Sequence, residues 1–324
     1  MIISVLLFIL GLVLLIKGGD WFVDGAVGIA KKLHIPDLLI GATVVSLGTT
    51  LPEVMVSAGA AVKGQGAMAY GNALGSIICN TALISAITIA VMPSLVDKKT
   101  IKTPIAFYFS AAAIYAAAAY VFGNFYRWVG IVLLIVFAVY MTVLIIKTKK
   151  EIASGVHVPE SEESEEKERS VLMNIFLLIL GAALIAVGAD LLVDHGTIIA
   201  RTLGVPETVI ALTFVALGTS LPELVTAITS LAKGHGALSL GNIIGANLFN
   251  LVLVSGIAIT LNPFKVPAEK LLGPYNASLV LDIPLTFIVM GLLTLPALIT
   301  GKLKRWQGIT LLVIYFSYVI FQFV

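Results

Sequence analysis

The chain has 324 residues, of which 59% are hydrophobic and only 12% are charged. Soluble domains carry about a quarter charged residues, so this composition favours a membrane protein. The net charge of +2, without basic patches interleaved with aromatic residues, argues against nucleic-acid binding. The single cysteine, Cys79, lies in an apolar run and is interpreted as a buried structural thiol. The sequence contains no Walker-type loop, so it does not support ATP-driven transport.

Long apolar runs predict an all-α membrane protein with ten transmembrane helices, because about 18 apolar residues suffice to cross a bilayer. The first run continues past the length of a signal-peptide core, and no A-x-A cleavage site follows it. The predicted spans are 2–31, 38–62, 67–92, 101–121, 127–147, 171–201, 207–232, 237–261, 277–299 and 306–323.

An acidic, polar stretch that contains PESEESEEKERS separates the fifth span from the sixth. It predicts a solvated linker, and weak calcium binding there is the less favoured alternative because no ordered calcium loop is present. The predicted organisation is a first five-helix repeat over 1–147, a linker over 148–170 and a second five-helix repeat over 171–324.

The two halves repeat one sequence at a constant separation, the one that leads from Glu53 to Glu223, and we call it the repeat offset. GNALGSIICN in the first half matches GNIIGANLFN in the second. Since each repeat holds an odd number of helices, the second must enter the membrane upside down, an arrangement typical of secondary transporters. The polar matches include Asp20/Asp190, Asp24/Asp194, Thr43/Thr213, Glu53/Glu223, Asn72/Asn242 and Asn80/Asn250.

Loops after the odd-numbered spans carry about three times as many Lys and Arg residues as the other loops. The positive-inside rule places those loops in the cytoplasm. Both termini are therefore predicted outside the cell membrane, and the linker inside.

Each repeat places a Pro-Glu pair near the middle of a predicted span, in LGTTLPEV and LGTSLPEL. A charge at that depth costs about 2.5–3.5 kcal/mol even on the more permissive insertion scale. No Lys or Arg lies at matching depth in the second, third, seventh or eighth span, so the predicted partner of Glu53 and Glu223 is a cation or a proton. Two carboxylates about 5 Å apart repel by roughly 3 kcal/mol, and either one divalent cation or several monovalent ions relieve this repulsion. A site that holds either one divalent cation or several monovalent ions, but not both together, exchanges one kind of ion for the other.

Pro52 and Pro222 lack the N–H that would bond Gly48 and Gly218, so a broken helix with free carbonyl groups is expected in each half. Those carbonyl groups, neighbouring hydroxyls and the two carboxylates would form an all-oxygen cage, which hard cations prefer. A proline kink used only for packing is the competing interpretation. In the GN..G motif of each repeat, the two glycines predict close helix packing. One Asn of each repeat would ligate the ion, while the other caps a helix end.

These paired motifs resemble the two alpha-repeats of the calcium/cation antiporter superfamily, here 43–80 and 213–250. The closest resemblance is to its prokaryotic sodium/calcium exchanger branch, and it covers nearly the whole chain. The resemblance implies a ten-helix monomer without cofactors that binds Ca²⁺ and Na⁺ between the second, third, seventh and eighth helices. It also implies Glu53 and Glu223 as calcium carboxylates.

The resemblance further implies roles for neighbouring residues. The calcium site would be completed by backbone carbonyls of Thr49 and Thr219. The flanking sodium sites would use hydroxyls of Thr50, Ser76 and Ser220 and carbonyls of Ser46 and Ala216, and the centre would be lined by Asn80 and Asn250. Two positions depart from the family pattern: Ala246 stands where the first repeat has Ser76, and Asn250 replaces the aspartate of potassium-dependent members.

The function expected is therefore exchange of Ca²⁺ for Na⁺ by alternating access, with export of Ca²⁺. A Ca²⁺/H⁺ antiporter is the alternative, because Ala246 weakens the sodium case. An ion channel and an intramembrane enzyme are less favoured.

The remaining acidic residues leave alternatives open. Four of them either line an ion path or lie at helix ends: Asp20, Asp24, Asp190 and Asp194. Asp20 is in reach of Lys17, and Asp282 is expected at the membrane interface.

Overall fold

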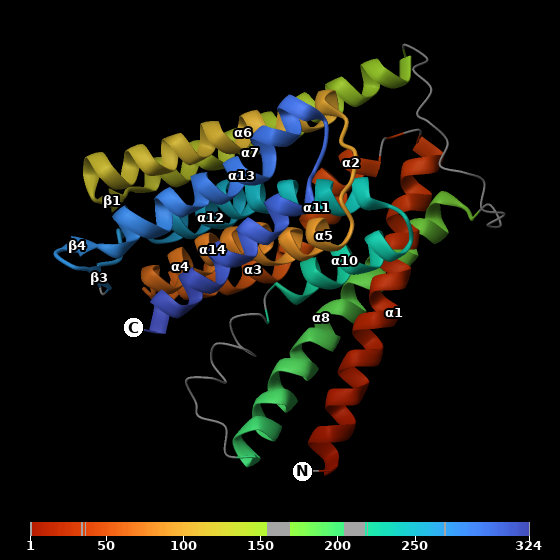
Figure 1. The fold of residues 1–324 in the computed structure, drawn as a ribbon, viewed down its shortest axis with the longest axis horizontal. Coiled ribbons are helices and arrows are strands. Elements are labelled where there is room, and N and C mark those ends of the chain that lie inside the picture. Colours follow the sequence, from red (N-terminus) through yellow and green to blue (C-terminus); the bar gives the residue numbers. More distant parts are fainter. Residues whose placement is uncertain are drawn as a thin grey trace.

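The computed structural model describes residues 2–33, 35, 37–153, 169–203, 218, 220–268 and 270–323, and this part of the chain is almost entirely helical (Figure 1). In the first half the helices are α1 (Ile2–Leu33), α2 (Asp37–Ile40), π-helical η1 (Gly41–Val45), α3 (Ser46–Val62), α4 (Gly66–Cys79), η2 (Asn80–Ser85), α5 (Ala86–Val91), α6 (Lys98–Ala117), η3 (Ala118–Phe122) and α7 (Arg127–Ala153).

In the second half the helices are α8 (Val171–Thr202), α10 (Leu221–Ala232), α11 (Gly236–Phe249), η5 (Asn250–Val254), α12 (Ser255–Leu261), η6 (Ser278–Asp282), α13 (Ile283–Thr300) and α14 (Arg305–Phe323). Two short antiparallel ladders complete the fold. One pairs β1 (Asn124–Phe125) with β2 (Phe264–Lys265), and the other pairs β3 (Leu271–Leu272) with β4 (Tyr275–Asn276).

Eight helices in the described residues are long and apolar enough to cross a membrane. They are Ile2–Leu33, Leu38–Val62, Gly66–Val91, Lys98–Phe122, Arg127–Lys150, Val171–Gly196, Gly236–Leu261 and Ser278–Thr300. The tenth predicted span forms α14. Only the end of the seventh is described, as α10, because 204–217 lie outside the described residues, so the count of ten remains a prediction.

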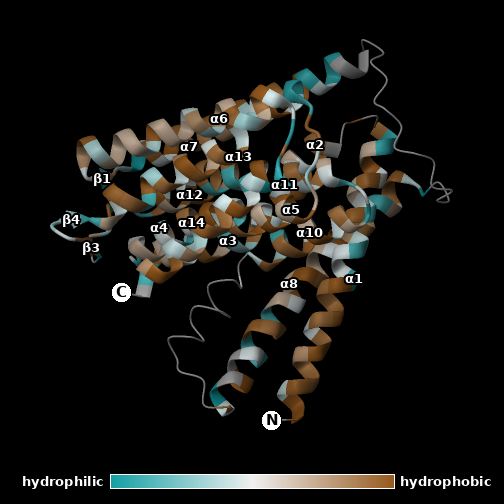
Figure 2. Cartoon of the chain, viewed as in Figure 1, coloured by the Kyte–Doolittle hydropathy of each residue, from teal (hydrophilic) through white to brown (hydrophobic). Residues whose placement is uncertain are grey.

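The residues of these helices are largely apolar (Figure 2). Large side chains such as Leu172 on α8, Leu6 on α1 and Val313 on α14 are more than half exposed. In a membrane such side chains face lipid rather than water. The exposed apolar side chains and the spanning helices together describe a multi-pass membrane protein.

Equivalent helices of the two halves begin and end at equivalent residues. The repeat offset carries both ends of Gly66–Val91 onto the ends of Gly236–Leu261. It also carries Val62, the last residue of α3, onto Ala232, the last residue of α10. The repeat seen in the sequence is therefore also a repeat in the local structure.

The first helices of the two halves, α1 and α8, lie side by side and project from the rest of the bundle (Figure 1). They are antiparallel, because Gly11 meets the carbonyl of Gly188 while Gly18 meets that of Gly181. A Cβ atom added at Gly11 would lie 2.9 Å from the Gly188 oxygen, so the backbones approach as only glycine allows. The repeat offset leads from Gly11 to Gly181 and from Gly18 to Gly188, so it exchanges one contact for the other.

The break predicted at Pro52 is wrong. Helix α3 runs from Ser46 to Val62 with Pro52 inside it, and the irregular turn lies earlier, in η1. The missing N–H of Pro52 still leaves the Gly48 carbonyl without its helical donor, but the other bonds of α3 maintain the helix. In the second half, α10 begins at Leu221 with Pro222 in its first turn, where a missing N–H breaks no bond.

One end of the bundle is rich in basic residues, and we call it the basic end. Strand-like pairing joins Leu95 to Lys302 there, and the Lys98 ammonium group donates to the carbonyl of Ile299 at 2.5 Å. The basic end contains Lys98, Lys99, Lys302, Lys304 and Arg305. The β1–β2 ladder lies at the other end of α6 and α7 (Figure 1).

Candidate functional site

Glu53 and Glu223 lie inside the bundle, on helices from different halves. Glu53 is in α3, and Glu223 is in the first turn of α10. Both side chains are 0% exposed, and their carboxyl groups interact electrostatically with each other. The structure therefore brings together the two carboxylates that the sequence singled out. The N-terminal end of α10 also favours negative charge at Glu223.

The four carboxylate oxygens of this pair have no hydrogen-bond partner among the described residues. An unpaired buried carboxylate costs several kcal/mol, and two that interact cost more. Within the same residues no group of three or more His, Cys, Asp and Glu side chains converges, so no further carboxylate joins the pair. Positive charge, as a cation or as protons, is needed to stabilise the site.

Hydroxyl groups surround the two carboxylates. Ser76 of α4 lies beside the Glu53 carboxyl group, and Thr49 of α3 lies beside that of Glu223. The Thr50 hydroxyl is buried without a partner in the described part of the chain, and Ser220 is buried just before α10 begins. The donors are thus mostly hard oxygen atoms, which suit calcium and sodium better than soft metals.

Asn80 and Asn250 are the first residues of η2 and η5, so each half starts a π-helical turn at the same asparagine. Both are 0% exposed, and all four of their side-chain amide atoms are without a hydrogen-bond partner among the described residues. Each amide therefore has an oxygen atom free to contact an ion.

Asn242 links the two halves beside the site, a role that the sequence did not predict. The Thr49 hydroxyl lies 3.2 Å from Asn242 Oδ1, and the Ser46 hydroxyl lies 2.9 Å from the Asn242 carbonyl oxygen. Its equivalent, Asn72, donates instead within its own half, to the Ser57 hydroxyl at 2.8 Å. Both asparagines support α3. Their match at the repeat offset singled them out in the sequence, but it did not show which helix they contact.

Two predicted site residues, Thr219 and Ala216, lie outside the described residues. The other nine are all buried or nearly so: Ser46, Thr49, Thr50, Glu53, Ser76, Asn80, Ser220, Glu223 and Asn250 are each at most 4% exposed. The structure thus gathers nine residues of the predicted site from both halves into the protein interior.

The acidic residues of the first helix lie apart from this interior. Asp24 on α1 pairs with Lys233 at 2.5 Å and with Arg169 at 3.4 Å, and Asp20 lies 3.5 Å from Lys233. Asp20 thus has Lys233 as its partner. Asp282, at the end of η6, is half-buried and accepts a hydrogen bond from the Tyr318 hydroxyl at 3.2 Å.

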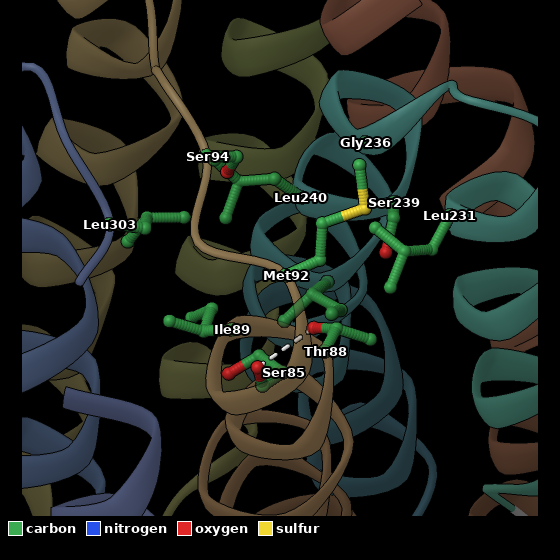
Figure 3. A pocket seen from close by; sticks show the side chains of 11 residues that line it. Ser85, Thr88, Ile89, Met92, Ser94, Leu231, Gly236, Ser239, Leu240 and Leu303 are labelled. Carbon is green, nitrogen blue, oxygen red and sulfur yellow. Dashed lines mark hydrogen bonds between the residues drawn. The ribbon is translucent and has the colours of Figure 1, made fainter. Parts of the chain in front are cut away.

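A separate small cavity lies at the basic end, between α5, α11 and the segments around Ser94 and Leu303 (Figure 3). Its lining includes the hydroxyl residues Ser85, Thr88 and Ser239 but neither carboxylate. It is therefore distinct from the carboxylate site.

A bundle of membrane-length helices around two buried, unpaired carboxylates and several oxygen donors defines a cation transporter. A family comparison agrees: residues 3–146 and 173–324 match the model of the sodium/calcium exchanger protein family. The chain belongs to this family. Its members are exchangers rather than enzymes, and membership makes the chain a cation/Ca²⁺ antiporter.

Three similar proteins extend the comparison. The chain is 34% identical to the uncharacterized membrane protein MJ0091 of Methanocaldococcus jannaschii, over 97% of this chain and 96% of that protein. It is 31% identical to the sodium/calcium exchanger MaX1 of Methanosarcina acetivorans, over 99% of each chain. A solved structure of the sodium-calcium exchanger NCX_Mj superimposes with a TM-score of 0.78 at 32% identity, covering 98% of each chain.

Proposed function

We propose that the chain exchanges Ca²⁺ for Na⁺ across the cell membrane and exports Ca²⁺. The observation that carries this proposal is the pair of buried carboxylates, Glu53 and Glu223, whose four oxygens have no partner in the described residues. Family membership and the similarity to exchangers named for sodium and calcium support the choice of ions.

The proposed site uses both halves. One Ca²⁺ binds Glu53 and Glu223 together with the backbone carbonyls of Thr49 and Thr219, and Asn80 and Asn250 line its centre. Sodium ions bind in flanking positions built from the hydroxyls of Thr50, Ser76 and Ser220 and the carbonyls of Ser46 and Ala216. Either set of ions neutralises the carboxylates, but both together would overcharge them, so one displaces the other.

We also propose that ten spanning helices form two inverted repeats, and that these give alternating access to the site. The antiparallel packing of α1 against α8 supports this arrangement, since their glycine contacts are exchanged by the repeat offset. The basic end is assigned to the cytoplasm by the positive-inside rule, which places both termini outside. The functional unit is a monomer, because each half completes the site of the other.

The test is radiolabelled calcium uptake into proteoliposomes under an outward sodium gradient, compared with an outward proton gradient. We expect uptake with the sodium gradient, and its loss in Glu53→Gln and in Glu223→Gln. The acid-to-amide variant Asp282→Asn is the matched control, because Asp282 lies elsewhere and is bonded to Tyr318. Folded protein without gradient-driven uptake would contradict the proposal.

A Ca²⁺/H⁺ antiporter is the second candidate. The observation that favours it is Ala246, which is buried and lacks the hydroxyl that Ser76 supplies in the first half. Uptake that follows the proton gradient and ignores the sodium gradient would establish this second function.

A further inference from the structure

The cavity at the basic end has four hydroxyl residues among the apolar residues of its lining, namely Ser85, Thr88, Ser94 and Ser239. It has about 20 Å³ of space for the centres of water molecules, which is room for at least one water. Ser239 of α11 and Thr88 of α5 line its depth and are 3% and 8% exposed, whereas Met92 at its mouth is 50% exposed. Figure 3 shows the Thr88 hydroxyl donating a hydrogen bond to the backbone carbonyl oxygen of Ser85, the last residue of η2.

Two further hydroxyls lie on α10, between Glu223 in its first turn and Leu231, which lines the cavity near its end. Thr226 and Ser230 follow Glu223 by about one and two turns of α10, so all three side chains lie near one face. Both residues are 0% exposed, and neither hydroxyl has a partner in the described structure. Ser230 directly precedes Leu231, which lines the cavity. Buried hydroxyls without protein partners are satisfied by water or by passing ions.

The equivalent region of the other half is closed. Ala60, Ala61, Ala69 and Ala258 pack there as a small apolar cluster, each at most 4% exposed. We call these four residues the alanine cluster. At the repeat offset they correspond to Ser230, Leu231, Ser239 and Thr88.

The mouths of the two regions differ in whether they are covered, although the polarity is reversed there: Met92 is apolar and Asn262 is polar. The equivalent of Met92 is Asn262, whose side-chain amide donates to the Ala61 carbonyl at 2.9 Å and so covers the alanine cluster. Met92 is thus exposed beside its cavity, whereas Asn262 is hydrogen-bonded over the alanine cluster. The two halves share one backbone plan but differ in polarity at matched positions.

We propose that the hydroxyl-lined cavity, with Thr226 and Ser230, is the hydrated route by which cations reach Glu53 and Glu223 from the basic end. The alanine cluster closes the equivalent route of the other half in this conformation. The inference rests on the proposed function, since it names the access route of the same site. It follows from the contrast in polarity, not from the presence of a cavity alone.

Because Cys79 is the only cysteine in the chain, cysteines introduced into a Cys79→Ser background report on single positions. The test variants are Thr88→Cys, Ser230→Cys and Ser239→Cys. Their matched controls at the repeat offset are Ala258→Cys, Ala60→Cys and Ala69→Cys, and Met92→Cys is the positive control. A membrane-impermeant thiol reagent is added to one face or the other of oriented vesicles.

Labelling is measured as a mass shift, and calcium exchange is measured in parallel. We expect the hydroxyl positions to react from the face that labels Met92→Cys. They should react about tenfold or more faster than the alanine positions, which a reagent reaches only through local opening. We also expect labelling of the hydroxyl positions to stop exchange.

Three results would overturn the inference or separate it from the proposed function. Equal labelling of Ser239→Cys and Ala69→Cys, with Met92→Cys reactive, would show that no hydrated route exists. Full exchange by labelled Ser239→Cys would show that the cavity is hydrated but is not the route. Absence of calcium exchange in the unmodified protein would contradict the proposed function, while the labelling pattern would still decide whether the region is hydrated.

A second variant does not depend on cysteine chemistry. The triple change Thr88→Ala, Ser230→Ala and Ser239→Ala gives the basic end three side chains of the alanine cluster. We expect slower exchange with unchanged calcium affinity, because the route loses polarity while Glu53 and Glu223 stay in place. An unchanged exchange rate in folded protein would contradict the route.

Discussion

Lys233, in the turn after α10, places its ammonium group 2.5 Å from the carboxylate of Asp24 on α1. The same ammonium group lies 3.1 Å from the Asp20 carbonyl oxygen, so one lysine contacts two successive turns of α1. These contacts tie the projecting α1–α8 pair to the helix that carries Glu223. Their partial exposure limits their strength, because water and salt screen such pairs.

Replacing Lys233 by Gln should therefore lower stability modestly. We expect a loss of about 1 kcal/mol in the free energy of unfolding, or roughly 2–4 °C in Tm. The control is Lys63→Gln, the exposed lysine at the equivalent position of the first half. The charge swap Asp24→Lys with Lys233→Asp should recover part of the loss, and equal shifts for Lys233→Gln and Lys63→Gln would refute a role for the ion pair.

Calcium binding, measured in the absence of transport, should depend on both carboxylates. Glu53→Gln or Glu223→Gln removes one charge from a buried site, for which we expect about a 100-fold weaker Kd, or roughly 3 kcal/mol. Calorimetric titration of calcium into purified protein measures this loss. Asp282→Asn should bind calcium as the unmodified protein does, and similar weakening in that control would indicate a nonspecific charge effect.

The buried position Ala246 should control sodium dependence. Ala246→Ser restores the hydroxyl that the first half has at Ser76. We therefore expect a sodium concentration for half-maximal exchange that is about fivefold lower, which corresponds to about 1 kcal/mol of tighter sodium binding. Ser76→Ala should change sodium dependence in the opposite direction. The measurement is the sodium concentration for half-maximal calcium uptake, and identical values in all three proteins would remove sodium from these positions.

Gly245 should not tolerate a side chain. A Cβ atom there would meet the Ser46 hydroxyl and would lie 2.7 Å from the Ala42 Cα, both across the helix contact beside the site. We expect Gly245→Ala to destabilise the protein by about 1–3 kcal/mol through overpacking. Gly291→Ala is the control, because a Cβ atom there would lie 3.7 Å from the nearest atom, Leu295 Cδ1, and because alanine favours a helix. Thermal unfolding distinguishes the two variants.

Asp97 caps the first turn of α6, just outside the spanning segment. Partial burial opposes its ionisation, but hydrogen bonds from the Thr100 hydroxyl and the Lys99 backbone N–H prevail and hold its pKa below its ordinary value of 3.8. A lowered carboxyl pKa stabilises the fold above the unfolded pKa and loses that contribution as the pH falls through the folded pKa. Asp97→Ala should cost about 1 kcal/mol at neutral pH, whereas Asp97→Asn should retain the cap and remove the acid-dependent part. Unfolding at pH 7 and in acid measures both.

Much of the fold follows from the sequence because hydrophobic length and repetition are physical constraints within one chain. The predicted span 38–62 matches Leu38–Val62, and 237–261 starts directly after Gly236. The proximity of Glu53 and Glu223 follows from the repeat, since residues at equivalent depths in two packed halves meet at the middle.

Other features depend on packing that a sequence does not display. Helix α3 continues through Pro52 because its remaining hydrogen bonds and neighbouring helices compensate for one missing donor. The pairing of Asp20 with Lys233, rather than with nearby Lys17, needs the turn after α10 to lie against α1. The link from Asn242 to Thr49 depends on the register between α11 and α3.

The glycine contacts between α1 and α8 also bear on how such a chain can originate. Gly11 and Gly18 of one helix meet Gly188 and Gly181 of the other, which are their own equivalents in reversed order. At these two glycines, α1 packs against α8 as it would against an antiparallel copy of itself. If each half is the five-helix unit proposed above, this contact would let a single unit form a two-fold dimer with opposite insertion. Joining two such units through a polar linker would make the dimer permanent and would free each copy to diverge, as at Ala69 and Ser239.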